Sequence, residues 1–433
     1  MKKTLALILA AVMALSLVAC AKTPANGGTE AKGSVYYLNF KPEADQAWQD
    51  LAKTYTEKTG VEVKVVTAAS GQYDTMLTSE LDKSAPPTMF QVGNQGAVNS
   101  YGDFCYPLDN TDVMKEMTTQ DFNLKNANGE TVSIGYCYEA YGIIVNKALL
   151  KQAGYELSDI TNFESLKKVA DDIHSRAAEL GFDAFSSAGL EGSSSWRFSG
   201  HLANMPLYYE FRDDGVTAQP ATITGAYLNN FKNIWDLYIT DSATTGAALA
   251  TATGDESEAE FGEGKAAFYQ NGSWEYSNLT GTFGMNPDDL AMIPIYCGVD
   301  GEEKAGLCSG TENCWAINSQ AKEEDIQASL DFLYWLVTDP DASAVLVEQL
   351  GAVPFKSCPA SANKFIVDGN ALLADGKYAV TWAFNYTPNV DSWRATVVTA
   401  LAAYSADPTD ANWEAVKTAF VDGWAIEYKT VNG

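Results

Sequence analysis

The sequence predicts an α/β protein with two domains that follow an apolar N-terminal segment. Strand-like and helix-like segments alternate from residue 34 onward, at the spacing of strand–helix units that form a mostly parallel sheet covered on both faces. The length of this part suits two ordinary domains. Apolar residues make up 46% of the chain and aromatic residues 12%, so folded cores are expected instead of disorder.

The N-terminal segment has the three parts of a secretory signal peptide. Lys2 and Lys3 precede an apolar run at residues 5–19, which is shorter than the ~20 residues that span a bilayer. The string Leu-Val-Ala-Cys at residues 17–20 resembles the lipobox of bacterial lipoproteins. This resemblance implies a lipid on Cys20 and cleavage that removes residues before it. An ordinary signal peptide with an incidental cysteine is the alternative.

Residues 20–33 are predicted to be the lipidated cysteine and a flexible tether, and residues 1–19 the signal peptide. The tether contains Gly, Ala, Thr and Pro without apolar periodicity. Two acyl chains on one cysteine hold a protein firmly at a membrane surface. We therefore expect a protein anchored by lipid to the outer face of the cell membrane, with a soluble body.

The first elements of the body follow from hydrophobic periodicity. They are strands at residues 34–40, 61–67 and 88–92 and helices at residues 43–59 and 73–84. The helix at residues 43–59 carries Trp48, Leu51 and Tyr55 on one face, and Gly60 is placed to end it.

The middle of the chain continues this alternation. It contains a predicted strand at residues 141–145 and a predicted helix at residues 147–153. Thr161 and Glu164 form a capping-box pattern ahead of a helix with a clear apolar stripe from Leu166 to Leu180, and Gly181 ends that helix.

The remaining elements are mainly helical. Strands are predicted at residues 182–185, 266–270 and 290–296, and helices at residues 323–338, 342–350, 392–405 and 412–428. The stretch at residues 244–260 is rich in glycine and acidic residues and is predicted to be a loop.

Charge and residue usage exclude several classes of function. The formal net charge of −28 at pH 7 leaves no basic stripe for nucleic acid and argues against binding to anionic lipid. Only His174 and His201 are histidines, so neither a zinc site of usual composition nor a cofactor site is expected. A secreted glycoside hydrolase with paired carboxylates stays open as an alternative, because 56 acidic residues make chance pairs common.

Six cysteines remain after Cys20. They are Cys105, Cys137, Cys297, Cys308, Cys314 and Cys358. The compartment permits disulfides, but six cysteines allow 15 pairings. Buried free thiols are the slightly preferred interpretation.

Tryptophans at the junctions between predicted elements suggest a site for a sugar, whose flat C–H faces stack on aromatic rings. Trp274 follows a strand and a turn capped by Ser273, and Trp196 and Trp393 have similar positions. Each of the last two precedes an arginine, Arg197 and Arg394, that could hold hydroxyl groups. Packing of Trp274 under its loop and surface ion pairs for the arginines are the alternatives.

Four strings resemble the extracellular solute-binding proteins of sugar ABC importers, the group that includes the maltose-binding protein. They are YEAYGIIVNK at residues 138–147, FGEGKAA through NGSW at residues 261–274, LGAVP at residues 350–354, and the helix at residues 393–405. The resemblance covers nearly the whole body, with the strings in the family's order.

The resemblance and the aromatic pattern together predict the ligand site. Its candidate residues are Asn39, Lys41, Asn94, Glu139, Trp196, Trp274, Glu312, Trp393 and Arg394. Trp274 and Trp393 would be the sugar platforms, and Glu139 would accept a hydrogen bond from a hydroxyl group beside the hinge. Asn94 stands where the family often has Asp, and its amide can both donate and accept.

The resemblance also implies the architecture and the role. We expect a two-lobed fold like that of periplasmic binding proteins, with one lobe from residues 34–140 and 315–360 and the other from residues 141–314 and 361–433. Such a monomer would close on a di- or oligosaccharide and deliver it to an ABC permease. A surface glycan-binding lipoprotein without a transport partner is the other alternative.

Overall fold

The computed structural model describes residues 32–351 and 353–433, and the predicted signal peptide, Cys20 and nearly all of the tether lie outside these residues. Residues 33–433 form one unit, and the following concerns that unit. Among its helices, none combines the length and the apolar character needed to cross a membrane.

The first sheet is mixed, with strand order β2-β1-β3-β11-β5-β4. Its strands are β1 (Ser34–Asn39), β2 (Glu62–Thr67), β3 (Met89–Gln91), β4 (Leu124–Lys125), β5 (Thr131–Gly135) and β11 (Cys314–Ile317). Strand β1 is parallel to both β2 and β3, whereas β11 is antiparallel to its neighbours β3 and β5.

Helices cover both faces of the first sheet. One core includes residues of α2 (Asp45–Thr59), α5 (Asp112–Glu116), α13 (Glu323–Thr338) and α14 (Pro340–Leu350), and the other includes residues of α3 (Tyr73–Leu81) and α4 (Gln95–Tyr101). Helix α2 buries Trp48, Leu51 and Tyr55 as its periodicity predicts, and it ends at Gly60, whose φ of 73° suits a residue without a side chain.

The second sheet is also mixed, with strand order β12-β10-β6-β8-β7. Strand β6 pairs in addition with β9. Its strands are β6 (Glu139–Asn146), β7 (Asp183–Phe185), β8 (Ala266–Gly272), β9 (Leu290–Ile293), β10 (Ala305–Gly310) and β12 (Tyr378–Thr381). Strand β6 is antiparallel to β8, β9 and β10, while β7 is parallel to β8 and β12 is parallel to β10. All strands except β6 therefore run in one direction.

The second sheet is covered on both faces as well. Its larger core involves α6 (Lys147–Gln152), α7 (Phe163–Ser175), α8 (Ala177–Leu180), α9 (Asn204–Asp214), α10 (Leu228–Thr240), α16 (Val390–Ala406) and α17 (Asp410–Asn432). Its smaller core involves α11 (Gly254–Gly262), α12 (Tyr276–Gly281) and α15 (Lys364–Ala374).

Short helical turns connect these elements. The 3₁₀ turns are Pro42–Ala44, Gly102–Phe104, Leu157–Asp159, Gly246–Ala250, Ser273–Glu275, Pro287–Asp289, Glu302–Lys304 and Ala383–Tyr386. Residues Arg197–Leu202 form a π-helix.

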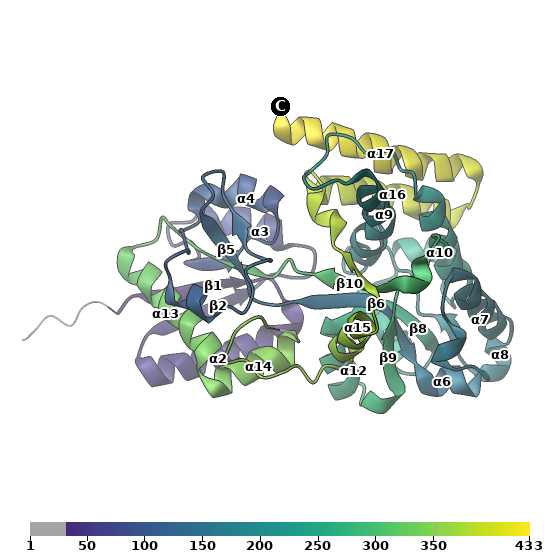
Figure 1. Cartoon of the computed structure of the whole chain (residues 1–433), viewed down its shortest axis with the longest axis horizontal. Helices are drawn as coiled ribbons and strands as arrows, with labels where there is room; N and C mark the ends of the chain where they lie inside the picture. Colours follow the sequence, from purple (N-terminus) through teal and green to yellow (C-terminus); the bar gives the residue numbers. More distant parts are fainter. Residues whose placement is uncertain (1–31, 352) are drawn as a thin grey trace, which may run out of the picture. The chain divides into compact units, whose positions relative to one another are not determined.

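The chain passes between the two lobes three times, the last time between α14 and α15, and the first two segments are adjacent. One segment joins β5 to β6 and the other joins β10 to β11, and the Tyr136 N–H donates to the Asn313 carbonyl between them at 2.9 Å. Figure 1 shows β6 and β10 extending toward the first group of helices and strands from the second. The two α/β lobes are thus joined by neighbouring extended segments, as a hinged protein requires.

Three predictions about the elements are wrong. The sheets are mixed instead of mostly parallel, because β6 and β11 adjoin the segments between the lobes and run opposite to their neighbours. The predicted loop at residues 244–260 contains most of α11, which Thr253 caps with Glu256 in a capping box. The cap of α7 is Asn162 with Ser165, and not Thr161 with Glu164.

Candidate functional site

Four of the candidate residues come shortly after the carboxyl ends of strands. Lys41 comes after β1, Asn94 after β3, Trp274 after β8 and Glu312 after β10. Ligands of open α/β sheets bind beyond the carboxyl ends of the strands. The site is therefore sought where these ends meet the segments that join the lobes.

Six rings form a connected group here, which we call the aromatic cluster. Its members are Tyr141, Trp196, His201, Trp274, Trp382 and Phe384. The His201 ring lies at the centre and stacks on Tyr141 at a centroid distance of 4.1 Å. Its centroid lies 5.0 Å from that of Trp196 and 5.2 Å from that of Trp274.

Two glycines make room for the tryptophans of the cluster. A Cβ atom on Gly272 would lie 2.2 Å from the Trp274 ring, and one on Gly310 would lie 2.6 Å from the Trp382 ring. Both glycines end strands, so each indole can lie directly against the backbone that leads to the site. A side chain at either position would displace the indole.

Of the three tryptophans in the cluster, Trp274 and Trp196 are partly exposed and Trp382 is buried. The ring centroids of Trp274 and Trp196 are 5.9 Å apart, and the Trp196 indole N–H donates to the Ser193 carbonyl at 2.8 Å. Trp274 lies in a 3₁₀ turn directly after β8, where the sequence places it, although Ser273 does not cap this turn. The Ser273 hydroxyl instead accepts a hydrogen bond from the Ala140 N–H at 3.2 Å.

Several buried polar atoms in and beside the cluster have no hydrogen-bond partner among the described residues. They are His201 Nδ1, Trp382 Nε1, Asn385 Oδ1, Arg394 Nε, and both amide atoms of Gln270. Most buried polar groups in proteins are paired, so a group of unpaired donors and acceptors calls for an explanation. Beside aromatic rings, these atoms could satisfy a ligand that carries neutral polar groups.

A buried ion pair connects the two lobes next to this cluster. Lys41 Nζ lies 2.6 Å from Glu139 Oε1 and 2.9 Å from a carboxylate oxygen of Glu43, and the Asn313 amide donates to Glu139 Oε2 at 2.6 Å. Burial lowers the pKa of Lys41, but the carboxylates of Glu139 and Glu43 outweigh it and raise that pKa above its usual value. Lys41 is therefore charged at every physiological pH.

This ion pair changes the expected roles of three candidates. Lys41 and Glu139 are each 4% exposed and bind each other, and Asn39 is fully buried. The Asn39 amide donates to the Lys41 carbonyl at 2.8 Å and to the Thr67 hydroxyl at 3.0 Å. These residues bind one another at the junction of the lobes. The contact of Lys41 with the cluster is a distance of 5.9 Å from its Nζ to the Trp274 ring centroid.

Asn94 and Glu312 adjoin each other at the same junction. The Asn94 side chain caps α4 by accepting from the Ala97 N–H at 2.9 Å. A Cβ atom on Gly93 would lie 2.2 Å from the Glu312 carbonyl oxygen, so the two backbones are in close contact. Burial raises the pKa of Glu312, and the Arg394 guanidinium opposes this effect.

The surroundings of Arg394 are acidic. Burial and the neighbouring carboxylate of Asp391 raise the pKa of Asp74, while Arg394 opposes the shift. Asp74 and Asp391 each lie in the first turn of a helix, α3 in the first lobe and α16 in the second. The site thus combines one arginine with carboxylates that do not favour an anionic ligand.

Trp393, the second predicted sugar platform, lies outside the aromatic cluster and inside the core of the second lobe. The side chain is fully buried, its indole N–H donates to the Phe420 carbonyl at 2.9 Å, and its ring packs against Phe420 and Trp424 of α17. Arg394, the next residue, does reach the cluster, because its guanidinium lies 5.3 Å from the Phe384 ring centroid.

Arg197 has neither of the roles considered for it. It is 1% exposed, and its guanidinium donates to the Ser187 and Gln270 carbonyls and to the hydroxyls of Ser194 and Ser257. It therefore anchors the start of the π-helix to the second sheet instead of binding a ligand or forming a surface ion pair.

Sequence reasoning missed four of the six members of the cluster. His201, Trp382 and Phe384 were not candidates, and Tyr141 was assigned only to a strand. Trp382 follows β12, a strand of only four residues. Such a short segment gives little periodicity to recognise in the sequence, and only one of its residues is buried. A strand prediction at residues 378–381 would have placed Trp382 at a strand end, as for Trp274.

The described residues offer no obvious place for a metal, since no group of three or more His, Cys, Asp or Glu side chains gathers among them. The six cysteines after Cys20 are free, and five of them are buried, which confirms the preferred interpretation.

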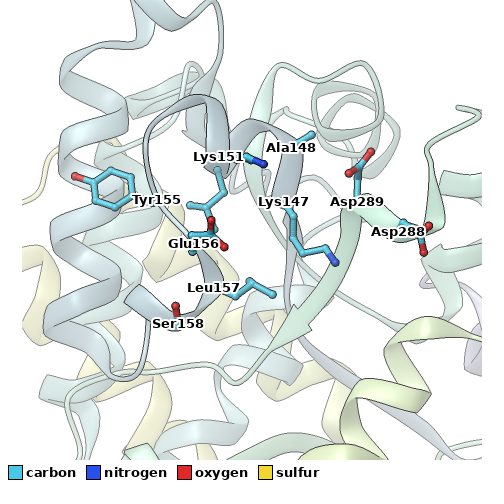
Figure 2. A pocket seen from close by; sticks show the side chains of 10 residues that line it. Lys147, Ala148, Lys151, Tyr155, Glu156, Leu157, Ser158, Asp288 and Asp289 are labelled. Atoms are coloured by element: carbon cyan, nitrogen blue, oxygen red, sulfur yellow. The ribbon is translucent and has the colours of Figure 1, made fainter.

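A depression elsewhere on the second lobe has a different character. It has a volume of about 610 Å³ and is lined by residues of α6, the following loop and the turn before β9. Figure 2 shows lysine, glutamate and aspartate side chains among the residues that line it. Charges of both signs and few aromatic rings line it, so it lacks the features of the cluster.

Comparison with known proteins gives a consistent picture. The family model described as bacterial extracellular solute-binding protein matches residues 50–374. The chain is 23% identical over 410 residues to the diacetylchitobiose binding protein DasA of Streptomyces coelicolor, covering 91% of this chain and 90% of that protein.

Solved structures share the fold. The binding protein RafE in complex with raffinose superposes with a TM-score of 0.72 at 14% identity, covering 92% of this chain and 99% of that one. The apo form of RafE from Streptococcus pneumoniae gives 0.65 at 15% identity, covering 93% and 100%. A chitin oligosaccharide binding protein gives 0.67 at 15% identity, covering 92% and 98%. The fold is thus that of two-lobed periplasmic-type binding proteins.

Proposed function

The chain belongs to the bacterial extracellular solute-binding protein family, and on this premise we propose that it captures a di- or oligosaccharide and delivers it to an ABC import permease. It is a binding protein and not an enzyme, which excludes a glycoside hydrolase.

The aromatic cluster is the observation that supports a sugar as the solute. Carbohydrate rings present apolar C–H faces to aromatic side chains and hydroxyl groups to neutral donors and acceptors. Trp274 and Trp196 offer partly exposed rings, and unpaired polar atoms of His201, Trp382 and Asn385 lie in or beside the cluster. Solutes that are mainly charged would leave the rings without a role.

The relatives are compatible with this proposal. Their names report diacetylchitobiose, raffinose and chitin oligosaccharides as ligands of those proteins. The carboxylates around Arg394 disfavour acidic sugars, so a neutral saccharide fits best. The identity of the sugar units does not follow from the fold.

The two adjacent joining segments supply the mechanism of capture. Closure of two lobes about adjacent extended segments buries a ligand between them and hides its polar groups from water. The Lys41–Glu139 pair and its Asn313 hydrogen bond lie at these segments, so they fix how the lobes meet. The closed, loaded protein is the form that we propose a permease recognises.

The lipid anchor is part of the same proposal. Cys20 in its lipobox would keep the protein on the extracytoplasmic face of the membrane, close to the permease. Labelling with a fatty acid tests this directly: Cys20→Ala should abolish incorporation, and a label that persists would contradict the anchor.

Binding of a saccharide panel tests the function. Raffinose, stachyose, diacetylchitobiose and acarbose are titrated calorimetrically into the purified mature protein, together with Trp274→Ala. We expect at least one of them to bind the wild-type protein and Trp274→Ala to bind it at least tenfold more weakly. Trp335→Ala is the control, because Trp335 is also partly buried but lies on α13 in the first lobe.

Two outcomes would count against the proposal. Failure of the wild-type protein to bind any saccharide would refute a sugar as solute. Binding without uptake of the sugar by cells that carry the protein and its neighbouring permease genes would favour the surface glycan-binding alternative.

A further inference from the structure

His201 has an unusual position for a core residue. It is the fifth residue of the π-helix Arg197–Leu202 and only 6% exposed. The Ala203 N–H donates to the Phe198 carbonyl at 2.9 Å, which is the i to i+5 bond of a π-turn. Such turns occur often at functional sites, because the extra residue changes the direction in which side chains project. Here the turn directs the imidazole into the aromatic cluster.

The imidazole contacts every other ring of the cluster. Besides Tyr141, Trp196 and Trp274, its centroid lies 5.7 Å from that of Phe384 and 5.9 Å from that of Trp382. A purely structural role in the middle of five aromatic rings would be filled better by an apolar side chain. His201 Nδ1 is nevertheless buried without a partner among the described residues, an arrangement that costs free energy.

The charged groups near His201 keep it neutral. Burial lowers its pKa well below the usual value, and the guanidinium groups of Arg394 and Arg197 lower it further. Arg394 lies very close to the preceding residue, since a Cβ on Gly200 would be 2.8 Å from its Nη2. A neutral imidazole has one nitrogen that donates and one that accepts. A hydroxyl group, which also donates and accepts, matches either tautomer.

We propose that His201 is a specificity-determining residue of the site, whose imidazole hydrogen-bonds a hydroxyl group of the sugar ring that stacks on Trp274. The 5.2 Å between the two ring centroids places the imidazole next to the Trp274 platform. This inference rests on the proposed function and adds a polar contact to the stacking surface. The Arg394 guanidinium, whose Nε has no partner among the described residues, lies against the same turn.

Two substitutions at one position separate hydrogen bonding from packing. His201→Phe keeps an aromatic ring among the five others but removes both nitrogens. His201→Asn loses the ring but places an amide atom close to where Nδ1 lies. The control is His174→Gln, which changes the other histidine of the chain, a partly exposed residue bound to Asp183.

The saccharide found to bind the wild-type protein is titrated into each variant, and the melting temperature is recorded without ligand. We expect His201→Phe to weaken binding at least tenfold while its melting temperature stays equal or rises. His201→Asn should bind more tightly than His201→Phe, and His174→Gln should bind like the wild type.

Each other outcome overturns a defined claim. Equal affinity of His201→Phe and wild type would refute the role of His201 and leave the proposed function intact. Loss of affinity together with a lower melting temperature, and no recovery in His201→Asn, would show that the ring matters only for packing. If the wild-type protein binds no saccharide of the panel, the proposed function fails and this inference fails with it.

Discussion

Trp274 and Trp393 look alike in the sequence but have opposite environments in the fold. Each lies near the start of a helical segment that follows a polar turn. Trp274 is partly exposed and contacts rings of the aromatic cluster, whereas Trp393 is fully buried and its N–H is already bonded to the Phe420 carbonyl. The local sequence therefore does not distinguish a partly exposed ring beside the junction from a core residue.

The difference comes from what packs over each indole. Helix α17 covers Trp393, and a Cβ atom on its Gly423 would lie 3.5 Å from the indole ring. Figure 1 shows α17 lying along α16, the helix that carries Trp393. Trp274 instead lies beside the junction of the lobes, where Lys41 Nζ of the first lobe is 5.9 Å from its ring centroid. A long-range contact, made by the last helix of the chain, decides the role.

The largest effect is expected for Trp393→Ala. Removing a fully buried tryptophan leaves a cavity against Phe420 and Trp424, and such truncations cost about 3–5 kcal/mol of stability. Urea denaturation measures this change. Ligand affinity of the folded fraction should be unaffected, and a stable Trp393→Ala variant that cannot bind sugar would overturn the comparison.

A smaller loss of stability is expected for Glu139→Gln. The substitution leaves the buried Lys41 ammonium with Glu43 alone, and breaking a buried ion pair costs about 3 kcal/mol. Glu43→Gln is the matched control. The Glu43 carboxylate is exposed, so its substitution should lower the free energy of unfolding by about 1 kcal/mol or less. Equal losses for the two variants would show that Glu139 does not hold the junction.

Trp274→Ala should change binding more than stability. A tenfold loss of affinity corresponds to about 1.4 kcal/mol, while the free energy of unfolding should change by about 1 kcal/mol or less because the ring is partly exposed. Chemical denaturation and calorimetric titration of the same sample give both quantities. A large loss of stability with intact binding would assign Trp274 to the core.

The smallest effect is expected from pH, at the carboxylates beside Arg394. The folded protein holds the Asp74 proton more tightly than the unfolded chain does, because the pKa of Asp74 is raised by burial and by Asp391. The protein therefore loses stability as the pH rises from the usual Asp pKa of 3.8 to the raised value of about 7, and this penalty is absent below 3.8 and complete above about 7.

Asp74→Asn removes that penalty. We expect it to stabilise the protein by about 1 kcal/mol at pH 8, which is less than the full pKa shift would give because Asp74 is partly exposed to solvent, and to have little effect at pH 4. Denaturation at the two pH values measures the difference. A stabilisation that is larger at pH 4 would mean that the pKa shift has the opposite sign.

Local patterns were sufficient for much of the fold. The apolar stripe of α13 gave its bounds of Glu323–Thr338 without error, and Gly181 ends α8 in the left-handed conformation as expected. Strand direction was not predictable, since β6 is an apolar run like its neighbours but runs opposite to them. The family resemblance supplied the two-lobed fold, which the family match and the solved structures confirm.

The candidate site was predictable only in part. Motif strings placed Trp274 after a strand and Glu139 ahead of one. They could not show that Glu139 is bound by Lys41 and Asn313. His201 carries no motif, because its role depends on a π-turn and on rings from three other segments of the chain. Contacts between distant segments carry this information, and periodicity does not report them.

A crystal structure of the protein with its bound saccharide tests the account most directly. We expect a sugar ring stacked on the Trp274 indole, with a hydroxyl group within hydrogen-bonding distance of His201, and Trp393 still packed beneath α17. A saccharide bound away from the aromatic cluster, with Trp274 making no contact to it, would contradict the account.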